Sequence, residues 1–101
     1  MNMLDKYIRR SRQTASRIWG RTAVIVLLPL NTTNFKENIF ELSSSGTYIW
    51  KLLEKKPNIR EIVKNFTKKN KIDSDIATRK VIKFIKYLAD EELVEISEKQ
   101  L

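Results

Sequence analysis

Apolar residues follow one spacing up to about residue 42 and another spacing after it, and this difference predicts a small sheet followed by helices. Residues 23–28 form a continuous apolar run centred on β-branched residues, which is typical of a strand. Residues 15–19 and 38–42 are predicted to be its antiparallel neighbours. Gly20 suits the tight turn after the first of them, because glycine readily adopts a positive φ. We therefore expect three short antiparallel strands, with one of them forming an exposed edge.

The stretch from residue 41 to residue 53 joins the last of these strands to the first helix. Three serines at 43–45 offer hydroxyl groups that accept hydrogen bonds from the N–H groups of a first helical turn. Apolar positions then recur at i, i+3, i+4 and i+7 and make one helix face: Gly46, Ile49, Trp50 and Leu53. We expect Trp50 to anchor the core. Glycine is a poor helix former, so Gly46 on this face predicts that another backbone passes close to it.

A second helix is predicted after a break at Pro57, which cannot continue a helix. Asn58 suits the N-cap position, and Glu61 three residues later makes an arrangement close to a capping box. The apolar stripe of this helix repeats the same spacing: Ile59, Ile62, Val63 and Phe66. A polar connection is expected at residues 68–71.

The third predicted helix begins at a cap formed by Asp73 or Ser74 and is the longest of the three. Its inner stripe contains Ala77, Val81, Phe84, Ile85 and Leu88. Residues 93–96 then alternate like a short final strand. Strands, three helices and a terminal strand indicate an α+β fold, a winged helix-turn-helix-like domain with an additional N-terminal sheet.

The domain is expected to span residues 15–101, because the first fourteen residues show no sustained periodicity. Residues 1–14 carry an Arg9-Arg10-Ser11-Arg12 cluster and are predicted to form a basic N-terminal arm, either solvated or a frayed helix. The Asn-Thr-Thr-Asn segment at 31–34 predicts a turn. No apolar run reaches membrane-spanning length and the N-terminus lacks the order of a secretory signal, so we expect a cytoplasmic protein.

Catalysis is disfavoured by the residue types that the chain lacks. The chain has neither cysteine nor histidine, which removes thiolate ligands, disulfides and the commonest general base. Ser43 to Ser45 are better explained as helix caps than as nucleophiles, and the carboxylates at 91–92 and at Asp73 and Asp75 lie at predicted helix ends, where acids are ordinary. Two glycines leave no phosphate-binding loop. We expect no enzyme activity, no cofactor and no metal.

The net charge of +8 favours an anionic partner, either nucleic acid or an acidic peptide. A low-GC genome rich in lysine codons would produce a similar composition. One hypothesis is a winged-helix DNA-binding protein whose third helix enters the major groove. Its basic residues would be Lys64, Lys68, Lys69, Arg79, Lys80, Lys83 and Lys86. Against this hypothesis, the third helix has no Asn or Gln, and only Arg79 can make a bidentate base contact.

Several phased segments resemble the PqqD family. They are Leu42-Ser43-x-x-Gly46-x-x-Ile49-Trp50, Asn58-Ile59-Arg60-Glu61-Ile62, Val81-x-x-Phe84-Ile85-x-x-Leu88 and Glu92-Leu93-Val94. The resemblance covers residues 36–96, with a looser fit over the two earlier strands. Two positions depart from the family pattern: Ser43 stands where Asn is usual, and Glu92 stands where Gly is common and is expected to weaken the end of the helix.

The resemblance implies a recognition element for ribosomally synthesised and post-translationally modified peptides, in effect a peptide chaperone in natural product biosynthesis. Such a domain binds the leader of a precursor peptide and presents the core to a modifying enzyme, a radical S-adenosylmethionine protein or a leader peptidase. In the family, the leader adds a strand beside the third strand and packs on the third helix. Carried over to this chain, the peptide-binding residues are Asn38, Ile39, Phe40, Glu41, Leu42, Thr78, Arg79, Ile82, Lys83 and Lys86.

The residues themselves are compatible with this mode of binding. A short unpaired edge beside an apolar and basic helix face suits β-strand addition, in which backbone hydrogen bonds supply affinity and side chains supply specificity. The same edge is also explained as a protected short strand without a ligand. Under the peptide hypothesis nucleic acid and membrane are not partners, and the oligomeric state is left open.

Overall fold

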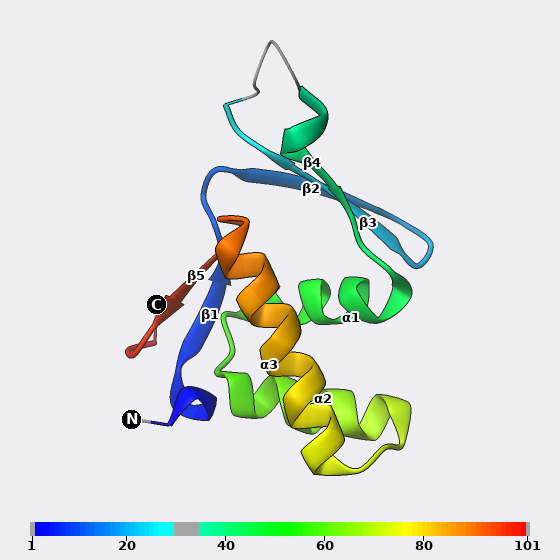
Figure 1. Cartoon of the computed structure of the whole chain (residues 1–101), viewed down its shortest axis with the longest axis vertical. Helices are drawn as coiled ribbons and strands as arrows, with labels where there is room; N and C mark the ends of the chain where they lie inside the picture. The colour runs from blue at the N-terminus through cyan, green and yellow to red at the C-terminus, as the bar shows by residue number, and fades with distance from the viewer. Residues whose placement is uncertain (1, 30–34, 101) are drawn as a thin grey trace.

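The computed structural model describes residues 2–29 and 35–100 and contains three helices and two small antiparallel sheets. In Figure 1 the three-stranded sheet lies above the helices, and the two-stranded sheet lies to their left. The helices are α1 (Ser44–Leu52), α2 (Ile59–Asn70) and α3 (Ser74–Asp90). Three short 3-10 helices accompany them: η1 (Met3–Asp5), η2 (Phe35–Asn38) and η3 (Leu53–Lys55). None of the described helices combines the length and the apolar character that a membrane crossing needs.

The first sheet contains the three strands that the sequence predicts. They are β2 (Thr14–Trp19), β3 (Thr22–Leu27) and β4 (Ile39–Glu41), antiparallel and in the order β2-β3-β4. Gly20 has a φ of +58° in the turn between β2 and β3, as expected. The predicted turn at residues 31–34 lies outside the described residues. The α+β order of elements is confirmed, with β4 at one edge of the sheet.

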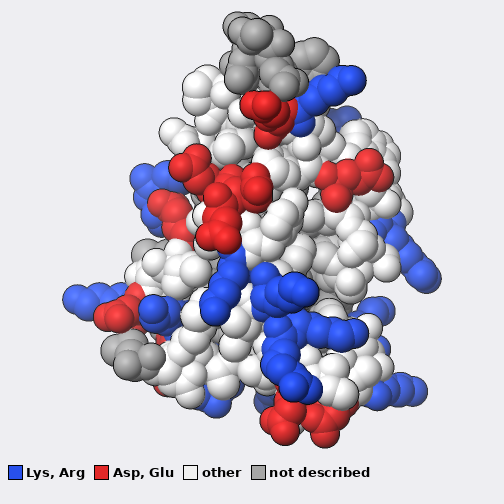
Figure 2. Space-filling model, in the orientation of Figure 1, with Lys and Arg blue, Asp and Glu red and all other residues white. Residues whose placement is uncertain are grey.

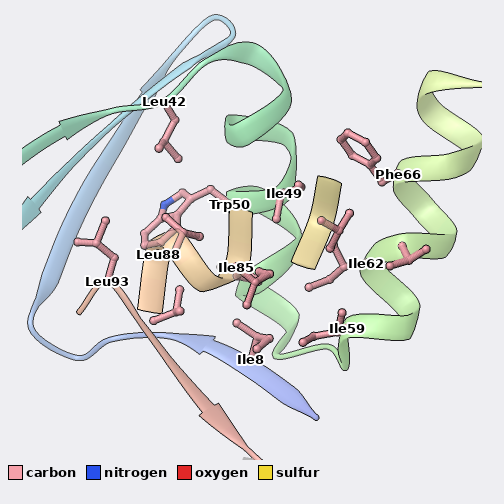
Figure 3. Close-up of a cluster of buried hydrophobic side chains, with 14 of the residues drawn as sticks. Ile8, Leu42, Ile49, Trp50, Ile59, Ile62, Phe66, Ile85, Leu88 and Leu93 are labelled. Atoms are coloured by element: carbon pink, nitrogen blue, oxygen red, sulfur yellow. The ribbon is translucent and has the colours of Figure 1, made fainter. Parts of the chain in front are cut away.

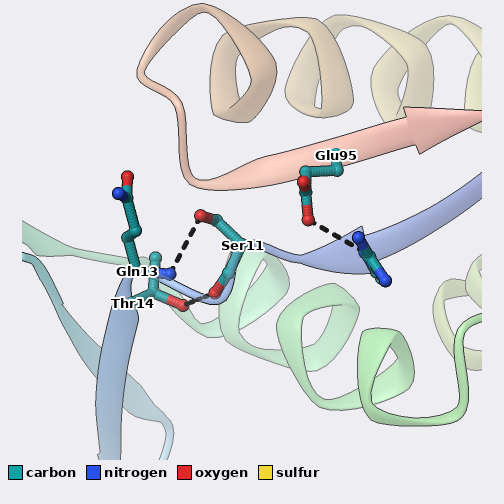
Figure 4. Close-up of polar contacts among 5 residues, drawn as sticks. Ser11, Gln13, Thr14 and Glu95 are labelled. Atoms are coloured by element: carbon teal, nitrogen blue, oxygen red, sulfur yellow. Dashed lines mark hydrogen bonds and ion pairs between the residues drawn. The ribbon is translucent and has the colours of Figure 1, made fainter.

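The second sheet corrects the prediction of a solvated arm or a frayed helix near the N-terminus. Strand β1 (Tyr7–Arg10) pairs with β5 (Val94–Ser97), so that Ile8 lies opposite Ile96 and is fully buried. Arg9 Nε donates to Glu95 Oε2 at 2.9 Å across this pair, as Figure 4 shows. A four-residue basic strand has no readable period, and its partner lies more than eighty residues away, so local sequence could not reveal it.

A tight polar turn connects the two sheets. The Ser11 carbonyl accepts a hydrogen bond from the Thr14 hydroxyl at 2.7 Å, and the Ser11 hydroxyl accepts one from the Gln13 N–H at 3.2 Å (Figure 4). The Ser11 N–H itself donates to the Leu93 carbonyl at 2.9 Å, which ties the turn to the chain just before β5. The basic cluster at the N-terminus is therefore held in the fold.

The predicted caps begin all three helices. Ser43 Oγ accepts from the Gly46 N–H at 3.3 Å, and Asn58 Oδ1 accepts from the Glu61 N–H at 2.8 Å. Asp73, one of the two candidates, caps α3 by accepting from the Asp75 N–H at 2.8 Å. The polar connection predicted at 68–71 is shorter than expected, because α2 continues to Asn70 and only its C-cap, Lys71, turns into the left-handed region. The lysines at the end of α2 lie on its exposed face, and in the sequence such a polar run is indistinguishable from a linker.

The end of α3 has the geometry that glycine favours. The Leu93 N–H donates to the Leu88 carbonyl at 2.9 Å and the Glu92 N–H donates to the Ala89 carbonyl at 3.0 Å, which is a Schellman motif. Glu92 has a φ of +64° and occupies the left-handed position of this motif. A side chain at this φ is strained, so the expectation that Glu92 weakens this helix end has a structural basis.

One hydrophobic core joins both sheets to the helices, with Trp50 at its centre (Figure 3). Trp50 is fully buried, and its indole Nε1 donates to Ser16 Oγ at 3.0 Å. The Arg10 guanidinium lies 4.7 Å from the centre of the Trp50 ring and donates to the Trp50 carbonyl at 2.7 Å. Burial lowers the pKa of Arg10, and nearby Glu54 acts in the opposite direction. Trp50 is the core anchor that the sequence predicts.

Candidate peptide-binding site

Strand β4 presents an open hydrogen-bonding edge. Within the described sheet it is the terminal strand and pairs only with β3, Phe40 lying opposite Ile25. The Leu42 N–H donates to the Ala23 carbonyl at 2.9 Å. Because alternate residues of a strand direct their backbone groups to opposite edges, the N–H and C=O groups of Ile39 and Glu41 point away from β3. An extended peptide can pair with these groups.

The side chains of β4 divide between the core and the surface, as the alternation of side chains along a strand requires. Phe40 is half-buried against the core and Leu42 is buried, whereas Ile39 is 42% exposed and Glu41 is exposed. The strand is shorter than the predicted 38–42 segment. Asn38 closes η2, and its side-chain Nδ2 donates to the Leu27 carbonyl at 3.2 Å. The exposed Ile39 leaves apolar surface beside the open edge.

The start of α1 contacts α3 at Gly46, and this contact corrects a prediction. A Cβ atom on Gly46 would lie 3.0 Å from Cζ of Phe84 and 3.4 Å from Cβ of Leu42. The close neighbour is therefore an aromatic ring and not another backbone. A side chain at position 46 would require the Phe84 ring to shift, so glycine allows the ring to pack closely on α1. The Phe84 flank of α3 faces α1 and the end of β4.

Lys80 and Phe84 also line a cavity at the end of β4. Its volume is about 390 Å³, and Ser43, Gly46 and Asn70 contribute to its wall. One turn further along α3, the Tyr87 ring stacks on Phe84 with 6.3 Å between ring centres and is 44% exposed. The helix flank that faces the end of β4 thus carries one basic residue and two aromatic rings.

The predicted helix residues lie mostly on the other flank of α3. Ile82 is two residues from both Lys80 and Phe84, and at 100° per residue its side chain points about 160° away from Phe84. Thr78 and Ile82 are half-buried, and Arg79, Lys83 and Lys86 are exposed. In Figure 1 the β1–β5 sheet lies to the left of α3, and α1 lies to the right. Because Phe84 contacts Gly46 of α1, the opposite flank faces away from α1 and is called the β1–β5 side of the helix. By helical rotation this flank carries Thr78, Ile82 and Lys86, and Lys83 lies between the two flanks.

Charge is distributed unevenly along α3. Figure 2 shows Lys and Arg gathered over its middle, where Arg79, Lys80, Lys83 and Lys86 are exposed, and acidic residues gathered around its C-terminal end. Neither of the two ion pairs formed among residues 2–29 and 35–100 involves this helix. The cations of α3 are therefore available to an anionic ligand.

Of the three serines after β4, Ser43 is the N-cap of α1, the role that the sequence favours, and Ser44 and Ser45 lie in the first turn of the helix. Ser43 Oγ accepts from a backbone N–H and lies 3.3 Å from Ser45 Oγ. Within the part of the chain that the structure describes, no group of three or more acidic side chains is arranged to hold a metal ion. The arrangement of this region suits the binding of an extended chain.

Comparisons with known proteins point to one family. The sequence profile of coenzyme PQQ synthesis protein D (PqqD) matches residues 25–94. A solved structure described as TbiB1 in complex with the TbiA(beta) leader peptide is similar with a TM-score of 0.75 and 28% sequence identity, covering 86% of this chain and 94% of TbiB1. Among curated proteins, none shows significant sequence similarity to the chain. The matched profile spans α1, α2 and α3 together with the edge strand, and the chain belongs to the PqqD family.

Proposed function

We propose that this protein is a recognition element that binds the leader segment of a ribosomally synthesised precursor peptide and presents the peptide to a modifying enzyme. Two findings support the proposal: the chain belongs to the PqqD family, and the similar TbiB1 structure contains a leader peptide. Neither comparison involves a nucleic acid. The proposed partners are therefore a precursor leader and an enzyme that acts on the core, either a radical S-adenosylmethionine protein or a leader peptidase.

The open edge of β4 is the single observation that carries the proposal. A leader added beside β4 would hydrogen-bond to the outward backbone groups of Ile39 and Glu41, and these bonds do not depend on the peptide's side chains. Specificity then comes from the surface on which alternate side chains of the peptide rest. Affinity and selection are in this way supplied by different parts of one site.

We place the peptide between β4 and the aromatic flank of α3. On the strand side the residues are Asn38, Ile39, Phe40, Glu41 and Leu42. On the helix side they are Lys80, Phe84 and Tyr87, with Lys83 at the outer rim. The resemblance implies four further residues on α3. They would contact the peptide only if it crosses to the β1–β5 side of the helix: Thr78, Arg79, Ile82 and Lys86.

In this role the protein binds and presents, and the covalent chemistry belongs to its partner. The chain alone is expected to show no turnover of the precursor. Its contribution is to raise the local concentration of the core at the enzyme by holding the leader, which needs no cofactor.

Nuclear magnetic resonance titration of the labelled protein with the leader of a precursor encoded beside it tests the proposal. We expect saturable shifts of the Ile39 to Leu42 amides and of the Lys80 to Tyr87 segment, and markedly weaker binding by a scrambled leader of equal charge, whose side chains no longer match the site. Shifts confined to residues 9–12 would overturn the proposal.

A salt series with duplex DNA as the second ligand separates peptide from nucleic-acid binding. DNA affinity falls by about 0.9 log units per log unit of salt for each phosphate contact, whereas a docked peptide with a few charged rim contacts depends on salt only modestly. Tight duplex binding with a steep slope would favour a winged-helix DNA-binding protein instead.

A further inference from the structure

A second cavity, also of about 390 Å³, lies beside α1 and is lined by basic residues from three separate elements. Arg21 comes from the turn between β2 and β3, Lys51 from the last turn of α1, and Lys69 from the end of α2. Tyr48, Ser45 and Asn70 complete most of its wall, and no carboxylate lines it. Three cations around one concave surface create a strongly positive potential.

These cations are not neutralised within the described residues. Neither Arg21, Lys51 nor Lys69 takes part in an ion pair there. Lys69 Nζ lies 5.8 Å from the centre of the Tyr48 ring, and the Tyr48 hydroxyl donates to the Asn65 carbonyl at 3.3 Å, so the aromatic wall is tied to α2. An anionic group in this cavity would relieve the repulsion among the three cations.

A smaller basic cavity near the N-terminus offers a weaker site. It has a volume of about 260 Å³ and is lined by Arg9, Arg10, Arg12 and Lys56, together with Glu54. Arg9 is already paired with Glu95, and Arg10 is engaged with the Trp50 carbonyl. Its cations are therefore partly satisfied, unlike those beside α1.

The cavity beside α1 continues the proposed path of the peptide. Ser45 and Asn70 line both this cavity and the Phe84 cavity at the end of β4, so the two adjoin. A chain that leaves the open edge near Ser43 enters the Phe84 cavity first and reaches Lys69 and Lys51 next. The described surface along this path carries Lys80, Lys69, Lys51 and Arg21 and no acidic lining residue.

We propose that the cavity beside α1 is a second subsite that binds acidic residues of the leader, in the segment that extends beyond the strand paired with β4. This inference rests on the proposed function and adds to it the chemical class of the peptide: Asp or Glu side chains adjoining a β-strand-forming segment. The β-paired segment supplies sequence-tolerant affinity, and the acidic segment fixes the register of the leader along the edge.

Titration of the full chain with hexaglutamate peptide tests the chemistry of this subsite directly. We expect saturable shifts at Arg21, Lys51, Lys69 and Asn70, no shifts with hexaglutamine, and much weaker shifts with inorganic phosphate. The Lys51→Gln/Lys69→Gln double variant should weaken hexaglutamate binding about tenfold, since two charge contacts are lost.

A double variant with the same net charge serves as the control. Lys55→Gln/Lys64→Gln alters two exposed lysines that line neither cavity, and we expect hexaglutamate affinity within about twofold of the parent protein. An equal loss in both double variants would mean that only overall charge attracts the peptide and would overturn the inference. Shifts centred on residues 9–12, or phosphate binding as strong as that of hexaglutamate, would overturn it as well.

The leader itself distinguishes this inference from the proposed function. If the leader shifts β4 amides and Lys51→Gln/Lys69→Gln leaves its affinity unchanged, the subsite inference fails and the proposed function stands. If the leader shifts no β4 amide, the proposed function fails, whatever hexaglutamate does. Weakened leader binding in this variant, with β4 shifts retained, is the result that we expect.

Discussion

Gly46 at the start of α1 faces the ring of Phe84 on α3, and the ring occupies the place of the missing side chain. A Cβ atom built on Gly46 would lie 3.0 Å from Cζ and 3.2 Å from Cε1 of that ring. The contact brings α1 and α3 together next to the end of β4, where Ser43, Gly46 and Phe84 line one cavity. The Phe84 flank of α3 therefore adjoins the end of β4.

Gly46→Val should destabilise the protein by about 2 kcal/mol, because the added methyl groups must displace the Phe84 ring. The cost should fall by about 1 kcal/mol when Phe84→Ala is present, and this coupling is measured by a double-mutant cycle of urea unfolding. Additive effects of the two substitutions would show that Phe84 does not restrict this site.

Glu92→Gly should stabilise the protein by about 0.5–1 kcal/mol, since glycine adopts the positive φ of the Schellman motif without strain. Glu91→Gly is a matched control because it removes the same charge at a residue whose φ is −87°. There, glycine only adds freedom to the unfolded chain and should destabilise by up to about 1 kcal/mol. Thermal unfolding of both variants is the measurement. Equal shifts of the melting temperature in the two variants would mean that the lost charge, and not the backbone conformation, causes the effect.

Trp50→Ala should destabilise the protein by about 3–5 kcal/mol, the usual cost of removing a buried large aromatic side chain. The substitution also removes the ring beneath Arg10 and the donor to Ser16. Lys51→Ala, at the next position, should change the free energy of unfolding by less than about 0.5 kcal/mol because its side chain is exposed. A comparable loss of unfolding free energy in the two variants, measured by denaturant unfolding, would contradict the assignment of Trp50 to the buried face of the helix.

Glu41→Pro should weaken leader binding about tenfold or more, because proline removes an outward N–H from the open edge. An edge strand tolerates proline at a position whose N–H faces solvent, so the pairing of β3 with β4 should persist. Glu41→Gln removes the charge and keeps the N–H, and should bind the leader nearly as well as the parent. Isothermal titration of both variants is the measurement. Undiminished binding by Glu41→Pro would exclude strand addition at β4.

Tyr87→Asp should weaken leader binding more than Ile82→Asp does, because Tyr87 lies on the flank that faces the end of β4. Ile82→Asp should instead lower thermal stability, since it places a charge at a half-buried position packed on the core. Leader titrations are therefore accompanied by melting curves. Loss of leader affinity in Ile82→Asp without loss of stability would place the peptide on the Ile82 flank of α3, which the family resemblance implies.

Sequence by itself determined the elements whose signals are local. The three caps and the apolar helix faces each rest on residues within a few positions of one another, and they form as predicted apart from Leu53, which lies in η3 directly after α1. The three strands of the first sheet were likewise indicated by their own short apolar patterns. The departure at Glu92 was visible against the family pattern, and the positive φ of this residue gives the physical reason for it. The family signature combines these same local features, which explains why sequence alone indicated it.

Tertiary structure decided what depends on distant contacts. Strand β1 exists because β5 pairs with it and the core covers Ile8, and neither condition leaves a pattern in the first ten residues of the sequence. The neighbour of Gly46 is an aromatic ring because α3 passes α1 at Phe84. The sequence predicted a close neighbour at Gly46 but did not identify the group. The orientation of α3 beside β4 follows from the same crossing. A helical repeat identifies the buried stripe of a helix, but only packing against other elements determines which of its two flanks adjoins the site.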